Sequence, residues 1–201
     1  MGTHTAKSLF DLNIQSAEDL LRLYDGIIKL KSKLDTKWIL RAVVVFSVAV
    51  LDAYFHDKIK YKAGKFSLHD MPPALAGFEV PLRDLVKWEE AERKGNVIRN
   101  WLTDRLSYQP LQRKDDIAKA LKLVGIESVW STIEPDENKR DSLISDMHDL
   151  IQRRNQISHE GDRQSSRRSG KELRPINRSY ASWSVDFVKK LVGKIENAFP
   201  N

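Results

Sequence analysis

The feature that most restricts the possible folds is the run AVVVFSVAVL at positions 42–51, in which Ser47 is the only polar side chain. The run is about half as long as the roughly 20 residues that a membrane-spanning helix needs, and Arg41 and Asp52 stand at its two ends. Helix-compatible residues extend the segment from about residue 36 to residue 61, which is too long for a strand. A helix that is apolar on nearly every side is typical of the middle of a helical bundle.

Apolar residues three and four positions apart dominate the rest of the chain, and we find no strand pattern of useful length and no internal repeat. Ser16 is expected to cap a first helix. Further helices are expected over residues 82–106, with a break near Gly95, and from about 115 to 125. Another is expected from 135 to a stop at Gly161, and a last helix is expected to end at Pro200. A short turn is expected at 128–133. We therefore predict an all-α fold: a single-domain bundle of five to six helices over residues 1–201, with its core at about 15–198 and a basic loop at about 162–179.

Composition limits the class of protein. A hydrophobic share of 41% and a charged share of 31% are typical of a folded soluble chain. Since the chain contains 0 cysteines, disulfides and thiolate metal sites are excluded, and a reducing cytoplasm is the expected compartment. The first residues lack the apolar stretch of a secretory signal, and no membrane association is expected.

One short motif has most of the chemical content: Arg154 and Asn155 are followed by His159. An arginine beside an asparagine can bind a phosphate, and a histidine can transfer protons near neutral pH, so these residues suit metal-free cleavage of an RNA backbone. Arg154 and His159 are five residues apart, about 140° around an ideal helix, so one straight helix does not direct both at one phosphate. A departure from helix near Gly161, or a second copy of the helix in a dimer, would relieve this.

Structural interpretations of the motif remain open. Arg154 falls on the same stripe as Leu143, Met147 and Leu150, where a guanidinium is costly unless it is paired. One alternative is therefore a buried ion pair for Arg154, with His159 capping the last carbonyl groups of the helix. Another is a purely structural dimer in which Arg154 pairs across the subunit contact.

Basic residues cluster around this motif. Between residues 153 and 178 there are eight lysines and arginines against three acidic residues, within a chain of net charge +6. Such a patch suits an anionic polymer, although a solvated loop is the ordinary alternative. The residues predicted to contact RNA are Arg153, Arg163, Arg167, Arg168 and Lys171.

Two more residues are candidates for a supporting role. Asp52 and His56 are four positions apart on the expected central helix and are predicted to border the site, the alternative being a satisfied polar cluster at a helix end. The histidines at 56, 148 and 159 lack the HExxH type of spacing. No glycine-rich phosphate loop or dinucleotide motif occurs either, so we predict neither a metal nor a cofactor.

Arg154, Asn155 and His159, late in a long helix and followed by a basic loop and a final helix, resemble the HEPN superfamily, whose motif is Arg-x4–6-His with a polar residue, often Asn, after the arginine. The string LIQRRNQISHEGD at 150–162 is most similar to the RiboL-PSP branch. The segment AYFHD at 53–57, together with the LVGI…VW segment at 123–130, supports the same resemblance. It would extend over about residues 15–198.

The resemblance implies a metal-independent endoribonuclease, in which two protomers of a homodimer pack their motif helices into one composite site, commonly in toxin or antiphage systems with an antitoxin or other partner protein. Arg154 would bind the scissile phosphate, His159 would act as general base or acid for attack by the ribose 2′-hydroxyl, and Asn155 would orient the groups. Single-stranded RNA or a tRNA loop is the expected substrate, because in-line attack needs a flexible backbone. The alternative is a non-catalytic helical module that binds RNA, a nucleotide or a protein through the same surface.

Overall fold

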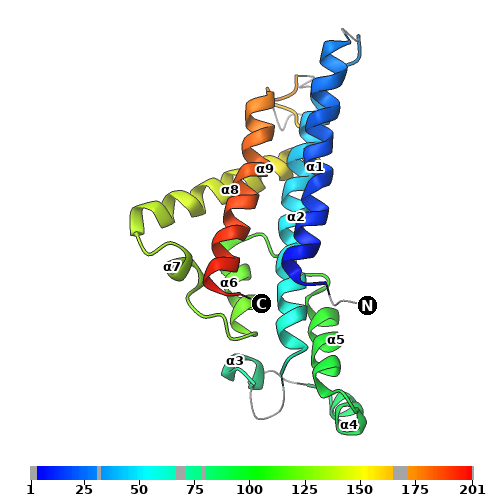
Figure 1. The fold of residues 1–201 in the computed structure, drawn as a ribbon, viewed down its shortest axis with the longest axis vertical. Helices are drawn as coiled ribbons and strands as arrows, with labels where there is room; N and C mark the ends of the chain where they lie inside the picture. The colour runs from blue at the N-terminus through cyan, green and yellow to red at the C-terminus, as the bar shows by residue number, and fades with distance from the viewer. Residues whose placement is uncertain (1–3, 31–32, 67–70, 78–79, 165–171, 201) are drawn as a thin grey trace. The chain divides into compact units, whose positions relative to one another are not determined.

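The computed structural model describes residues 4–30, 33–66, 71–77, 80–164 and 172–200. These residues form nine helices and one isolated β-bridge but no strand (Figure 1), which confirms the all-α prediction. The helices are α1 (Ala6–Lys29), α2 (Lys37–Ala63), α3 (Pro73–Ala76), α4 (Leu82–Glu90), α5 (Lys94–Leu106), α6 (Lys114–Lys122), α7 (Val129–Ile133), α8 (Glu137–Glu160) and α9 (Arg178–Ala198). The count exceeds the predicted five to six because it includes the short helices α3 and α7. In addition, the chain leaves the helical conformation between α4 and α5, so these two are counted separately.

Two predicted helix boundaries are wrong. Helix α1 begins at Ala6 and is capped by Thr5, whose Oγ1 accepts a hydrogen bond from the Ser8 amide at 3.1 Å. Ser16, the predicted cap, lies exposed within this helix. The buried stripe of α1 already includes Phe10, so tertiary burial extends the helix toward its N-terminus. The break between α4 and α5 falls at residues 91–93, and Gly95 lies in the first turn of α5.

The described chain forms two compact units, each assembled from separate stretches. The first unit contains Met1–Leu9, Asp52–Arg140 and Ile195–Asn201, and the second contains Phe10–Leu51 and Asp141–Lys194. The long helices α1, α2, α8 and α9 therefore each contribute to both units.

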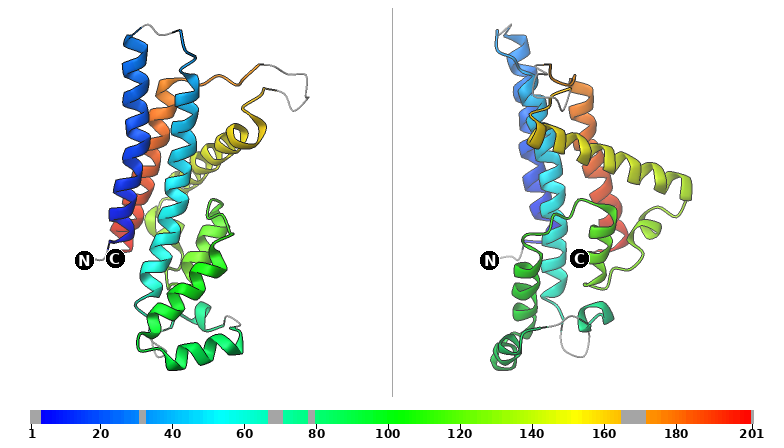
Figure 2. Two further views of the ribbon diagram at one scale, coloured as in Figure 1. Left: turned by 90° about the vertical axis from the view of Figure 1, so that its right-hand side faces the viewer. Right: turned by 180° about the vertical axis from the view of Figure 1, so that it is seen from behind.

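In the second unit, α1, the first half of α2 and α9 run side by side, and α8 crosses them (Figures 1 and 2). Val43, Val44 and Val48 of α2 are fully buried, and Ser47 Oγ lies 3.3 Å from Ser184 Oγ of α9. Each fully buried aliphatic side chain stabilises the fold by about 1.5–3 kcal/mol. The predicted central helix is confirmed, but it is not buried on every side, because Phe46 is 46% exposed.

Among the described helices, α2 is the one that could cross a membrane, judged by its length and composition alone. Of its most apolar window, 56% is buried inside the protein. Arg41 and Lys58 of the same helix are buried and paired with carboxylates, as in the core helix of a bundle.

The first unit has its own polar cluster inside an apolar core. Lys58 is fully buried and donates to Glu196 Oε1 at 2.9 Å, and the Tyr54 hydroxyl donates to the same oxygen at 2.6 Å. Burial raises the pKa of the Tyr54 hydroxyl and lowers the pKa of the Lys58 ammonium. The end of α2 also packs closely on α5, since a Cβ at Gly95 would lie 2.3 Å from the carbonyl oxygen of Gly64.

Candidate functional site

The end of α8 has a defined backbone conformation that fixes the motif region. Gly161 and Asp162 both have positive φ, 62° and 59°, which is a left-handed conformation that glycine adopts easily and aspartate tolerates. The Asp162 amide donates to the carbonyl of Gln156 at 2.9 Å and closes the final turn. The prediction that Gly161 ends the helix is confirmed.

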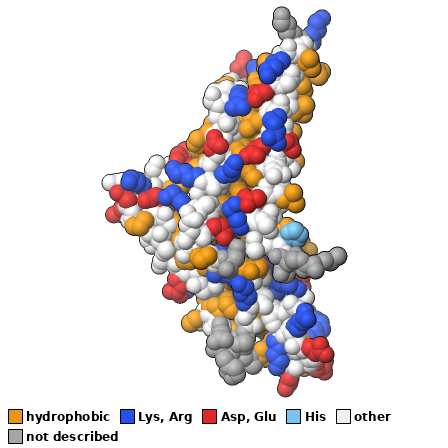
Figure 3. All heavy atoms as spheres, viewed as in Figure 1, with side chains coloured by type: hydrophobic (Ala, Val, Ile, Leu, Met, Phe, Trp, Pro, Cys, Tyr) orange, Lys and Arg blue, Asp and Glu red, His pale blue; other side chains and the backbone are white. Residues whose placement is uncertain are grey.

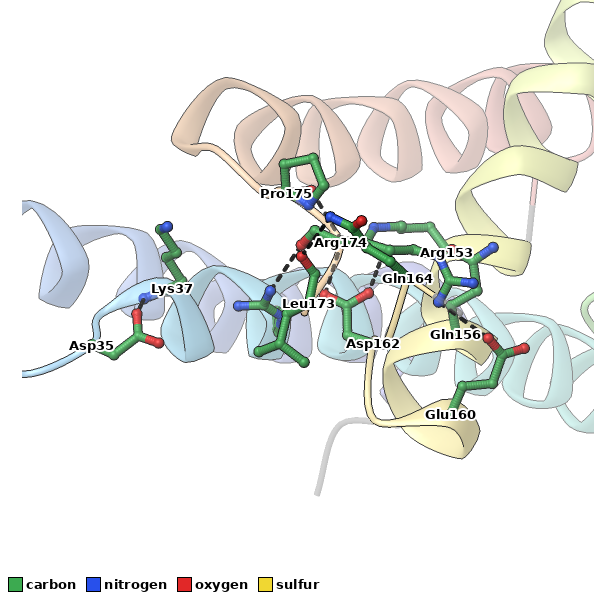
Figure 4. Close-up of polar contacts among 11 residues, drawn as sticks. Asp35, Lys37, Arg153, Gln156, Glu160, Asp162, Gln164, Leu173, Arg174 and Pro175 are labelled. Atoms are coloured by element: carbon green, nitrogen blue, oxygen red, sulfur yellow. Dashed lines mark hydrogen bonds and ion pairs between the residues drawn. The ribbon is translucent and has the colours of Figure 1, made fainter. Parts of the chain in front are cut away.

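Asp162 is the centre of a buried ionic cluster (Figure 4). Its side chain is 0% exposed, and two arginines bind it: Arg41 from α2 through Nε, and Arg153 from α8 through both Nη atoms. Arg153 Nη2 lies 3.0 Å from Asp162 Oδ2. Bidentate binding of a carboxylate by a guanidinium is among the stronger polar interactions in proteins.

The same cluster holds the part of the predicted basic loop that precedes α9. The Arg174 amide donates to the Asp162 carbonyl at 2.7 Å, and Arg41 Nη2 donates to the Arg174 carbonyl at 2.9 Å. Arg153 Nη2 also donates to the Pro175 carbonyl at 3.2 Å. The end of α8 and the segment before α9 are therefore joined through one buried carboxylate (Figure 4).

The two adjacent arginines of the motif helix have different roles. Arg153 is 12% exposed and bound to Asp162, whereas Arg154 is half-buried and its Nη1 donates to Asn155 Oδ1 at 2.8 Å. The predicted alternative of a buried ion pair thus applies to Arg153 and not to Arg154. Arg154 is the arginine of this pair that is available to a phosphate.

His159 lies exposed in the last turn of α8. Among the described residues, no hydrogen bond or ion pair to its imidazole is observed, so capping of carbonyl groups by His159 is not seen there. The motif therefore places a guanidinium and an imidazole on one helix.

The basic residues around the motif are partly used within the fold. Arg174 pairs with Glu160 at 3.1 Å, and Arg178 pairs with Asp25 at 3.0 Å. The hydrogen bond from Arg178 holds the pKa of the Asp25 carboxyl below its ordinary value. Over α1 and α9, lysine and arginine side chains are interspersed with acidic ones (Figure 3).

The predicted RNA contacts have different outcomes. Arg153 is bound to Asp162, and Arg163 is exposed and forms the isolated bridge with Leu173 through its backbone. The remaining three predicted contacts, Arg167, Arg168 and Lys171, lie outside the described residues. A contact between RNA and Arg163 stays a prediction.

Asp52 and His56 both belong to the first unit. The Asp52 carboxylate accepts a hydrogen bond from the Leu111 amide at 2.6 Å, which is a structural use of this side chain. His56 is half-buried. Their supporting role at the motif stays a prediction. Within the described part of the chain, no group of three or more histidine, aspartate or glutamate side chains is placed to hold a metal ion.

The roles of Arg41 and Asp162 were not predicted from the sequence. A signal for Arg41 was present, since an arginine at the edge of a strongly apolar helix requires a partner when it is buried. Nothing local identified that partner, which lies 121 residues away along the chain.

An all-helical fold with an Arg-Asn-x-x-x-His motif near the end of a long helix is the arrangement of a HEPN-type domain. More particularly, the chain belongs to the RiboL-PSP-HEPN family, whose family model matches residues 12–197. No curated protein and no solved structure matches the chain. Membership of this family supports a nuclease or RNA-related function in general terms.

Proposed function

We propose that this protein is a metal-independent endoribonuclease that cleaves single-stranded RNA or tRNA loops. The observation that supports this most is the difference between the two adjacent arginines. Asp162 binds Arg153 and fixes the end of α8, while Arg154 donates to its neighbour Asn155 and His159 stays exposed. A toxin or antiphage system is the setting that the family resemblance implies.

The proposed reaction is an internal transesterification. The ribose 2′-oxygen attacks the phosphorus, the bond from phosphorus to the 5′-oxygen breaks, and a 2′,3′-cyclic phosphate and a 5′-hydroxyl result. The proton of the 2′-hydroxyl passes to a base and the leaving 5′-oxygen receives a proton, and His159 serves one of these steps. Arg154 stabilises the negative charge on the phosphate, and Asn155 orients Arg154.

A dimer completes the proposed site. Because Arg154 and His159 point about 140° apart on a regular helix, we propose that Arg154 of one protomer and His159 of its partner act on the same phosphate. Two-fold symmetry would then create two equivalent sites.

Cleavage assays test this proposal. Purified protein is incubated with single-stranded RNA and with tRNA, with and without EDTA, and the product ends are mapped. We expect cleavage that survives EDTA and leaves cyclic phosphate ends. His159→Ala is expected to lower the rate by about 100-fold or more, whereas His148→Ala, which removes an exposed histidine of the same helix, is expected to retain it. Equal activity of these two variants would defeat the assignment of His159.

A mixing experiment tests the composite site. Arg154→Ala and His159→Ala proteins are each expected to be inactive, and a mixture that exchanges subunits is expected to regain roughly a quarter of the wild-type activity, since half of the dimers would have one complete site of two. No recovery, despite proven subunit exchange, would show that each site is built within one protomer. Binding of RNA without any cleavage would instead support the non-catalytic module.

A further inference from the structure

A cavity of about 320 Å³ lies beside the motif within the second unit. It is lined by side chains from α8 and from the start of α9 and the segment before it. The lining includes Asp149, Gln152, Arg153, Gln156, Asn177 and Tyr180. Its volume lies at the lower end of the range for small-ligand sites.

The charge of this cavity does not suit a phosphate. Among the described residues that line it, Arg153 is the one with a positive charge, and its guanidinium is already bound to the Asp162 carboxylate, which it shares with Arg41. Asp149, which is 67% exposed, adds a negative charge at the rim. A neutral group with hydrogen-bonding edges fits this lining better than an anion does.

The polar groups of the cavity are of the kind that read nucleobases. Gln152 is exposed, and no hydrogen bond to its amide is observed within the described part of the chain. Asn177 Oδ1 accepts the Tyr180 amide at 2.8 Å, which leaves the Asn177 side-chain NH2 group as a donor. Side-chain amides and carboxylates discriminate bases through donor and acceptor patterns, and a tyrosine ring can stack on a base.

The cavity is one helical turn from His159. Gln156 and His159 are three residues apart on α8, so their Cβ atoms are neighbours on the helix surface and about 4.5 Å apart along its axis. Figure 4 shows Arg153, Gln156 and Pro175 together at this end of α8. A base in the cavity can therefore belong to a nucleotide next to a phosphate held at the motif.

We infer that this cavity is a base-recognition subsite, which rests on the proposed ribonuclease function. It favours a base with an exocyclic amino group next to the cleaved bond, because the Asp149 carboxylate accepts hydrogen bonds from such a group. The subsite gives the enzyme a sequence preference that the phosphate-binding motif alone does not provide.

Cut-site mapping on RNA of random sequence tests the subsite. We expect the wild-type protein to prefer amino-bearing bases over uridine by about tenfold next to the cut, and we expect Gln152→Ala and Asp149→Asn to reduce this preference at least severalfold. Gln15→Ala, an exposed glutamine of α1, is the matched control and is expected to keep the preference. An unchanged preference in both cavity variants would overturn the subsite and leave the nuclease proposal intact.

A binding experiment distinguishes the base-recognition subsite from the proposed ribonuclease function. Short 2′-O-methyl RNA oligonucleotides, which differ in one base and cannot be cleaved, are titrated by fluorescence anisotropy against the wild-type protein and the two cavity variants. Base-dependent binding that the variants lose supports the subsite even if no RNA is cut. Binding that is the same for all four bases overturns it.

Discussion

Replacement of Asp162 by asparagine isolates the charge of the buried cluster. Asparagine has nearly the same shape and tolerates the positive φ of 59° at this position, so the backbone contributes little to the change. The variant removes a negative charge from between Arg41, which is 2% exposed, and Arg153, which is 12% exposed. Two buried guanidinium groups then lack their counter-ion, and breaking a buried ion pair in this way destabilises a protein by about 3–5 kcal/mol.

Thermal and denaturant unfolding measure this loss. For a chain of this size, about 3–5 kcal/mol corresponds to a fall in Tm of roughly 6–20 °C. Glu160→Gln is the matched control, since it makes the same chemical change two residues away on a carboxylate that is 52% exposed and pairs with Arg174. We expect the control to cost under about 1 kcal/mol.

The two variants together can refute this reasoning. If Asp162→Asn loses under about 1 kcal/mol, or no more than Glu160→Gln, then the cluster does not hold the end of α8. If it loses the predicted amount, RNA cleavage measured well below its Tm is expected to fall as well, because the turn that follows His159 depends on Asp162.

Three further changes have predictable effects on stability. Burial raises the pKa of the Asp57 carboxyl, so the folded state disfavours its charged form. Asp57→Asn is therefore expected to raise Tm near neutral pH. This gain in Tm is expected to shrink in melts recorded at lower pH, as the pH falls toward the unfolded pKa of about 3.9. Gly95→Ala, whose Cβ would meet a backbone oxygen, is expected to lower the free energy of unfolding by about 1–3 kcal/mol. Gly193→Ala, whose Cβ would have nothing within 4 Å, is expected to raise it by about 0.4–1 kcal/mol. Equal effects of the two variants in urea titrations would contradict the packing argument. Glu196→Ala removes the carboxylate that pairs with the fully buried Lys58 and is expected to lower the free energy of unfolding by about 3–5 kcal/mol in the same titration. A loss under about 1 kcal/mol would show that this pair does not stabilise the fold.

Local patterns were sufficient for the class of fold and for the position of the motif. The apolar run at 42–51 predicted a central helix, and Gly161 predicted the end of α8, because helix periodicity and left-handed glycine caps depend on residues close together in the chain. The start of α1 was predicted wrongly because Thr5 and Ser16 are both good capping residues, and burial of the residues between them decided which one begins the helix.

The sequence by itself determined that the chain is helical and that Arg154, Asn155 and His159 lie near the end of one long helix. Only the tertiary structure decided which of the two adjacent arginines is structural. That choice depends on Asp162 and on Arg41, 121 residues away, which meet only when α2 and the end of α8 pack together. The cavity beside the motif likewise exists only because the start of α9 returns to α8, and no pattern within either segment indicates it.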